Sequence, residues 1–296
     1  MAMTVRTGAT GAAGRANASE ESDQVSATGY SRSGQGEPLV LLHGLGSSRA
    51  AWDAIVPALS QRFDVIAVDL PGFGASAPLP AGTEPSPAEL ATAVAGMLND
   101  LGIDRPHLVG NSLGGWVTME LAKTRPVRSV TLLSPAGLWR GGTPLYCRVT
   151  LRLSRWLARH ARPALSTIVF TRPGRVLVLG QIFGHPARLT AAQARSALHE
   201  LGTCPGFDAA LKATRRRRIR GAQQVTAPVT VAFGSRDLVL LRHQSRNLGE
   251  LPPGTQSAAL PGCGHLPMTD DPARVTDLIV TSAARASDAT SPRPRP

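Results

Sequence analysis

Short apolar runs alternate with amphipathic helical patterns along most of the chain. Leu39–Leu42 and Val65–Val68 contain no polar side chain, a pattern typical of strands buried on both faces of a parallel sheet. Similar runs recur downstream. The expected strands are a weak one in residues 25–34, then Leu39–Leu42, Val65–Val68, Pro106–Val109, Val127–Leu133, Pro228–Phe233 and Gln256–Leu260.

Helical periodicity fills the intervals between these runs. The expected helices are one from Ser47 to Leu59, then Ala88–Leu101, Trp116–Lys123, a segment around Leu238–Leu251, and Asp271 to about Ala284. Strands and helices that alternate at this spacing predict an α/β fold, in which helices cover both faces of a mostly parallel sheet.

The alternation breaks in residues 138–224, where prolines interrupt helical patterns and no strand pair follows. We therefore expect a core made of residues 25–137 and 225–284, with a helical insertion between them. Residues 1–24 are small, polar and non-periodic, and residues 285–296 are polar and proline-rich. Both ends are therefore expected to be disordered tails.

Apolar residues make up 42% of the chain, which is enough for a globular core. The three cysteines (Cys147, Cys204 and Cys263) are odd in number and far apart, which fits a reducing compartment better than a disulfide framework. The chain shows neither a convincing signal peptide nor an apolar run that could span a membrane. We therefore expect a cytoplasmic protein. No Cys/His spacing indicates a metal.

The net charge of +12 is concentrated in the insertion. Residues 138–220 hold sixteen basic and two acidic residues, a net +14, so the rest of the chain carries −2. The run Arg215–Arg218 is not expected to bind nucleic acid, because no aromatic residues are interleaved with it and no recognition module is present.

Residues 147–160 form the clearest helix of the insertion. Arginines and apolar residues occupy different faces of it: Arg148, Arg152, Arg155 and Arg159 on one, and Val149, Leu153, Trp156, Leu157 and His160 on another. Such a helix can meet an anionic membrane surface or attract anionic substrates. We favour the simpler interpretation, in which the arginine side is only the solvated side.

The stretch Gly110-Asn111-Ser112-Leu113-Gly114 joins an expected strand to an expected helix. A serine held between glycines in this setting is the pattern of a nucleophile elbow, a tight turn that lifts a hydroxyl clear of the sheet. The amide of Leu113 at the helix N-terminus can then donate to an oxyanion. A glycine-rich turn with an N-capping serine is the alternative.

Two further polar residues follow strands. Asp237 comes just after the run that ends at Phe233, and His265 lies in a glycine-flanked loop after the last strand. Serine, aspartate and histidine in this chain order make up the triad of a serine hydrolase, in which the imidazole activates the hydroxyl and the carboxylate orients the imidazole. Individually, Asp237 can be a helix cap, and His265 a loop residue that binds backbone.

The chain resembles α/β-hydrolase fold enzymes over about residues 28–284. The resemblance rests on His43-Gly44-Leu45-Gly46, Asp69 to Ser76, Gly110 to Gly115, Gly234 to Asp237, and Gly264-His265. It implies an eight-stranded, mostly parallel sheet with a helical lid inserted after strand 6. It also implies that the amides of Leu45 and Leu113 form the oxyanion hole, that His43 is structural, and that Asp69 holds its glycine-rich loop. Gly44, Gly110, Asn111 and Gly114 would support the site.

We therefore expect a serine hydrolase that cleaves a carboxylic ester or a related small acyl substrate, with no metal or organic cofactor. Because the insertion is rich in arginine, an anionic substrate stays one of the alternatives. Carbon–carbon bond hydrolases of meta-cleavage products, perhydrolases and acyltransferases use the same triad, and a ligand receptor on this scaffold is the non-enzymatic alternative. Relatives with an aspartate nucleophile, such as epoxide hydrolases, are excluded by Ser112. The oligomeric state stays open.

Overall fold

The computed structural model describes residues 28–290, so the predicted tail of residues 1–24 lies outside the described residues, as do residues 291–296. One seven-stranded sheet organises the described chain, in the order β1-β3-β2-β4-β5-β6-β7. Every neighbouring pair is parallel except β1 with β3. The strands are β1 (Tyr30–Ser33), β2 (Glu37–Leu42), β3 (Phe63–Val68), β4 (His107–Asn111), β5 (Ser129–Leu133), β6 (Val229–Gly234) and β7 (Gln256–Leu260).

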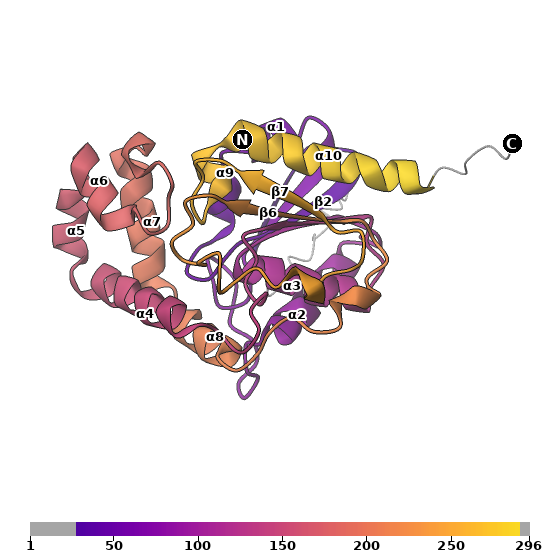
Figure 1. Ribbon diagram of the computed structural model, residues 1–296, viewed down its shortest axis with the longest axis horizontal. Coiled ribbons are helices and arrows are strands. Elements are labelled where there is room, and N and C mark those ends of the chain that lie inside the picture. Colours follow the sequence, from indigo (N-terminus) through magenta and orange to yellow (C-terminus); the bar gives the residue numbers. More distant parts are fainter. Residues whose placement is uncertain (1–27, 291–296) are drawn as a thin grey trace, which may run out of the picture.

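Helices cover both faces of the sheet, as predicted (Figure 1). The short helix α1 and the long helix α10 lie on one face, and α2 and α3 lie on the other. Leu39 and Leu41 of β2 are buried in the same apolar cluster as Ile279 of α10, whereas Val40 and Leu42 join the cluster of the opposite face. The helices are α1 (Val56–Leu59), α2 (Pro87–Asp100), α3 (Leu113–Thr124), α9 (Pro267–Asp270) and α10 (Pro272–Thr290).

The strand count differs from the eight that the resemblance implies. The sequence pattern predicted seven strands, the first of them weak, and the sheet of residues 28–290 has seven. The insertion therefore follows the fifth strand of this sheet, β5, not the sixth. No helix among the described residues combines the length and apolarity that crossing a bilayer requires.

Three predicted helices differ from the structure. The helix expected from Ser47 to Leu59 is a 3-10 turn, η1 (Arg49–Trp52), followed by the one-turn helix α1. Around Leu238–Leu251 there is only a 3-10 turn, η4 (Leu248–Glu250). The Asn247 amide donates to the distant Leu138 carbonyl and not to a carbonyl of the preceding turn, as a continuous helix would require. The last helix continues past residue 284 into the predicted tail, since alanines favour helix up to the prolines that begin at position 292.

The helical insert (residues 138–224) connects β5 to β6 and lies on the side toward which the arrowheads of β6 and β7 point (Figure 1). Parallel α/β sheets place their chemistry at these carboxyl ends. The insert contains five α-helices and two 3-10 turns: α4 (Leu145–His160), α5 (Arg162–Ile168), α6 (Arg172–Leu179), η2 (Pro186–Arg188), α7 (Ala191–Thr203), α8 (Phe207–Thr214) and η3 (Ala222–Gln224).

Candidate active site

Ser112 occupies a sharp turn between β4 and α3. Its backbone has φ 53° and ψ −116°, and only one other non-glycine residue among the described residues, Ser134, has a positive φ. The Ser112 amide donates to the Leu133 carbonyl (3.1 Å), and the Ser112 carbonyl accepts from the Ala136 amide (2.9 Å). The side chain makes no capping hydrogen bond to α3, so the interpretation of Ser112 as a simple helix cap is wrong. A strained residue held in this way is typical of a functional turn.

Both glycines of the elbow are required by close approach of other groups. A Cβ at position 114 would lie 2.1 Å from the Leu42 carbonyl oxygen, and a Cβ at position 110 would lie 2.3 Å from Thr118 Oγ1. Because β2 and α3 press directly on this turn, no side chain larger than hydrogen fits at either position.

His265 and Asp237 are hydrogen-bonded to each other, although they lie in separate loops. His265 Nδ1 is 2.8 Å from Asp237 Oδ2, and both residues are buried. The other carboxylate oxygen, Oδ1, accepts from the amides of Val239 and Leu240, each at 2.9 Å. Asp237 thus both stabilises its own turn and binds the imidazole.

Burial by itself would raise the pKa of Asp237. The charge and hydrogen bond of His265, together with the two backbone amides, outweigh burial and lower the pKa below its usual value. The carboxylate therefore stays ionised beside the imidazole at neutral pH.

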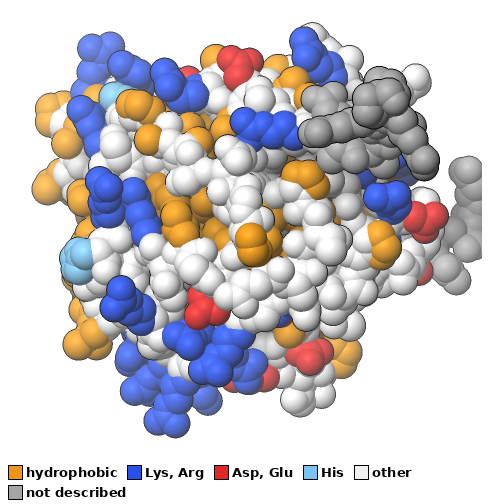
Figure 2. Space-filling view, turned by 45° about the vertical axis from the view of Figure 1, so that its right-hand side comes forward, with side chains coloured by type: hydrophobic (Ala, Val, Ile, Leu, Met, Phe, Trp, Pro, Cys, Tyr) orange, Lys and Arg blue, Asp and Glu red, His pale blue; other side chains and the backbone are white. Residues whose placement is uncertain are grey.

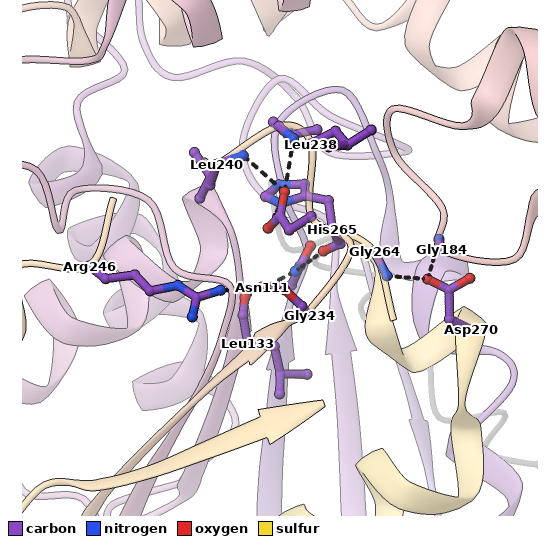
Figure 3. A network of polar contacts seen from close by, with 12 residues as sticks. Asn111, Leu133, Gly184, Gly234, Leu238, Leu240, Arg246, Gly264, His265 and Asp270 are labelled. Atoms are coloured by element: carbon purple, nitrogen blue, oxygen red, sulfur yellow. Dashed lines mark hydrogen bonds and ion pairs between the residues drawn. The ribbon is translucent and has the colours of Figure 1, made fainter. Parts of the chain in front are cut away.

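Asn111 connects the elbow strand to the histidine loop (Figure 3). Its side-chain nitrogen donates to the carbonyls of Leu133 (3.0 Å) and His265 (2.9 Å). The amide of His265 donates in turn to the Ile182 carbonyl in the insert (2.7 Å). The backbone of His265 is therefore held from both the core and the insert. The sequence pattern placed Asn111 at the site without assigning these bonds.

Asp270 is a supporting residue that the sequence analysis did not select. One of its oxygens accepts from the amides of Gly184 and Gly264, both at 2.8 Å (Figure 3). The other oxygen accepts from the His185 amide at 2.9 Å. Asp270 thus joins the loop of His265 to the insert. No local pattern could reveal this role, because Gly184 lies 86 residues away in the chain.

The two amides expected to form an oxyanion hole lie near Ser112. Leu113 is the first residue of α3, and Leu45 follows the end of β2. Both residues line the same cavity as Ser112. Within residues 28–290, neither amide donates a hydrogen bond to a protein group. Both donors are therefore available to an oxygen bound at the serine.

His43 is completely buried beneath the site and holds its loops together. Its Nε2 accepts from the Leu70 amide (3.0 Å), so Nδ1 carries the proton and donates to the Gly44 carbonyl (2.8 Å). The neighbouring Asp69 accepts from the amides of Arg49 (2.7 Å) and Ala75 (2.9 Å) and holds the glycine-rich loop. These contacts fit the structural roles that the resemblance implies for His43 and Asp69.

We expect His43 to make the protein less stable in mild acid. Burial lowers its pKa to about 4, although the Gly44 carbonyl and Asp69 oppose the shift, whereas an unfolded histidine has a pKa of about 6.5. Between these values only the unfolded chain binds the proton, so the free energy of unfolding should fall by up to ~3 kcal/mol as pH is lowered through this window. Urea unfolding from pH 7 to pH 4 measures the fall, which should be smaller in His43→Gln. The exposed-site variant His160→Gln should retain the fall; an equal fall in all three proteins would contradict the assignment.

A cavity of about 260 Å³ opens onto Ser112 and His265 between the core and the insert. Helix α4 contributes Cys147, Leu151 and Ser154 to its wall. Most of the lining is apolar, and the acidic side chains in it are Asp53 and Glu200. Although the insert is rich in arginine, none of its arginines lines this cavity.

Comparison with known proteins places this chain in a family. A model of the alpha/beta hydrolase family matches residues 39–278. The chain is 31% identical to pimeloyl-[acyl-carrier protein] methyl ester esterase of Aeromonas hydrophila, over 84% of this chain and 96% of that protein. It is 30% identical to epoxide hydrolase EphH of Mycobacterium tuberculosis, over 66% of this chain and 94% of that protein.

Solved structures show the same fold. A meta-cleavage product hydrolase of Pseudomonas fluorescens IP01 aligns with a TM-score of 0.69 and 24% identity, over 88% of this chain and 94% of that chain. Similarity to a solved structure at this identity shows the fold alone. Membership of the family rests on the family model, which covers most of the chain. The resemblance first seen in the motifs is thereby confirmed: the chain belongs to the alpha/beta hydrolase family and is a hydrolase.

Proposed function

We propose that the protein is a serine hydrolase that cleaves a carboxylic ester with an uncharged, largely apolar acyl group. The observation that carries the proposal is that Ser112, on its strained elbow, and His265, which is hydrogen-bonded to Asp237, line one mostly apolar cavity. A serine and a base at one cavity, with an ionised acid bound to the base, are the components of acyl transfer.

The reaction proceeds through an acyl-enzyme. Ser112 Oγ attacks the ester carbonyl while its proton passes to His265 Nε2, the ring nitrogen that Asp237 leaves free. The amides of Leu45 and Leu113 bind the oxyanion, a contribution of about 3 kcal/mol for a well-placed donor. His265 then protonates the departing alcohol. Water, deprotonated by the same imidazole, attacks the acyl group and releases the acid and free Ser112.

The charges around the cavity favour a neutral substrate. Asp53 and Glu200 face the cavity and no arginine or lysine does, so a substrate carboxylate would meet like charge. Burial raises the pKa of Glu200, mainly because its charged form loses solvation, and its carboxyl accepts a hydrogen bond from Ser196 (3.3 Å). These acids weigh against the acidic substrates of carbon–carbon hydrolases.

We expect the cavity acids to discriminate between ester charges. Two unit charges about 8 Å apart interact with about 2 kcal/mol at an effective dielectric constant of 20, which exceeds a factor of ten in kcat/KM. At pH 8, p-nitrophenyl butyrate should therefore be preferred over mono-p-nitrophenyl succinate by about tenfold or more. Glu200→Gln should reduce this ratio about fivefold, and Glu89→Gln, on the outer surface of α2, should not. If the ratio of kcat/KM for the two esters were the same in Glu200→Gln as in the wild type, the charge of Glu200 would not be the cause of the preference.

A fluorophosphonate probe tests the chemistry itself. It should label Ser112, as located by peptide mass, and labelling should be at least about 100-fold slower in His265→Ala. The labelled enzyme should lose turnover of p-nitrophenyl butyrate. Labelling of another serine, equal labelling after His265→Ala, or faster turnover of a vinylogous diketone acid than of any ester would overturn the proposal.

A further inference from the structure

Exposed hydrophobic side chains are concentrated on the insert. Among the described residues, all the large exposed ones except Leu238 and Leu248 lie between residues 145 and 177, in α4, α5, α6 and the turn between α5 and α6. Trp156 is 56% exposed, and Leu177, on α6, is 81% exposed. Isolated apolar residues on a surface are ordinary, whereas a cluster of this kind marks a site of contact.

Helix α4 shows the arrangement most clearly. Leu145, Val149, Leu153 and Trp156 recur at spacings of four, four and three residues, so they form one stripe, and all four are more than half exposed. The other side of the helix is buried against the protein through Cys147 and Ala158. The apolar stripe therefore faces outward.

The solvated surface of α4 therefore includes the apolar stripe as well as Arg152 and Arg159, whereas one arginine of the same face is buried. Arg155 is buried within the insert, where it donates to the Leu201 carbonyl (2.6 Å), pairs with Asp208 (3.5 Å) and stacks on Phe207 (4.9 Å). Packing of α4 within the insert thus buries one arginine and leaves the apolar stripe in solvent.

Arginines flank the stripe. Arg152 and Arg159 are exposed, each three residues after a member of the stripe, Val149 and Trp156 respectively. Arg195 lies over the exposed ring of Phe170 at 5.5 Å. Residues 141–199 contain no aspartate or glutamate. Figure 2 shows Lys/Arg and hydrophobic side chains intermingled on the side where the insert lies, on its left. The surface is therefore both apolar and cationic.

We propose that this outer face of α4 (Leu145, Val149, Leu153 and Trp156, with Arg152 and Arg159 beside them) docks on the surface of a bilayer that contains anionic phospholipid. Indole and leucine side chains partition into the headgroup–acyl boundary, and arginines beside them pair with lipid phosphates. A twofold contact between copies of the chain would instead bring the same cationic rims together. Residues 1–27 contain two arginines and three acids, so they offer little opposite charge.

Docking on this face would bring the cavity close to the lipid. Cys147, Leu151 and Ser154, on the inner side of α4, line the cavity that Ser112 opens into. The inference concerns binding alone and does not rest on the proposed hydrolysis. It is therefore tested with Ser112→Ala, so that no ester cleavage by this serine alters the vesicles.

Trp156 provides a direct readout. The other three tryptophans, Trp52, Trp116 and Trp139, are at most 3% exposed. Vesicles of equimolar phosphatidylglycerol and phosphatidylcholine should therefore shift the emission of the full chain to the blue, with a smaller shift on pure phosphatidylcholine and none when Trp156→Phe is added. An emission unchanged by phosphatidylglycerol would overturn the proposal.

Sedimentation with the same vesicles separates the two contributions. Leu153→Glu should weaken binding about tenfold by placing a charge in the stripe, and Arg152→Glu with Arg159→Glu should weaken it at least about 25-fold, since each arginine near an anionic surface contributes about a factor of five. The matched controls are Leu248→Glu, on an exposed site of the core, and Arg62→Glu with Arg105→Glu, which changes the net charge equally. The controls should bind within about twofold of the parent.

Three results would contradict the inference. The first is equal loss of binding in the controls, which would indicate non-specific attraction of a cationic protein. The second is a lipid-free dimer that Leu153→Glu converts to monomer, which would assign the face to a second copy. The third is a Trp156 emission typical of a buried indole before lipid is added, which would mean that another part of the chain covers the face.

Discussion

Replacing Ser112 by alanine is expected to lower kcat for p-nitrophenyl butyrate by about 10⁵-fold while leaving the fold intact. In a triad the residues act as a unit, so loss of the nucleophile removes nearly all of the chemistry and leaves only binding and oxyanion stabilisation. The Ser112 side chain makes no hydrogen bond to α3, so its removal costs the turn no contact of that kind. Thermal unfolding should therefore change little, and a steady-state assay with purified variant measures the loss.

Ser134 supplies the matched control. It is also a buried serine with a positive φ, 43°, at the end of a neighbouring strand. It does not line the cavity, and its hydroxyl has no partner among the described residues. Ser134→Ala should retain activity within about threefold. If Ser112→Ala kept more than about a hundredth of wild-type activity, or if Ser134→Ala lost as much, the nucleophile would have to be sought elsewhere.

Replacing Asp237 by asparagine is expected to lower kcat about 10⁴-fold, although the side chain keeps its size. The position of Oδ1 accepts from two backbone amides, those of Val239 and Leu240. The asparagine carbonyl must take that position, which turns the NH₂ group toward His265 Nδ1. The imidazole can then accept only at Nδ1, so its proton moves to Nε2, and Nε2 can no longer take the proton of Ser112.

The control for this variant is Asp271→Asn, which removes the same charge a few residues after His265. Asp271 pairs with the exposed Arg274 (3.2 Å) and makes no bond to His265. Its variant should stay within about threefold of wild type. Near-normal kcat in Asp237→Asn would show that the carboxylate is needed only for the turn and not for orienting the imidazole.

Local patterns predicted the core of the molecule well. Apolar runs marked the central parallel strands β2 to β6 because residues there are buried on both faces, so even a four-residue run is distinctive. The elbow was equally clear, since glycine is required at positions 110 and 114, where the Thr118 side chain and the Leu42 carbonyl leave no room for a Cβ. Errors arose where local propensity was weak, as in the loop around Leu238–Leu251, where the Val239 amide donates to the Asp237 side chain and the Asn247 amide to the distant Leu138 carbonyl.

The contacts that support the site could not be predicted in the same way. Asn111 and Asp270 bind backbone groups of segments that are distant in the chain, and Gly184 and His185 lie inside the insert. Backbone carbonyls and amides carry no sequence signature, so such bonds become visible only when the loops are brought together. The charge of the cavity could not be predicted from the sequence either, because Glu200 lines the cavity whereas the arginines of the insert do not.

The sequence by itself determined the alternation of strands and helices, the strained serine elbow and the order of serine, aspartate and histidine, because these follow from residue types at short spacing. It also determined that α4 has an apolar face and an arginine-rich face. Only the tertiary structure decided that the apolar stripe is solvated together with Arg152 and Arg159, and that Arg155 is buried. Periodicity defines the two sides of a helix, but the packing of neighbouring helices determines which side is buried, and here α7 and α8 take up Arg155 and leave Trp156 in solvent.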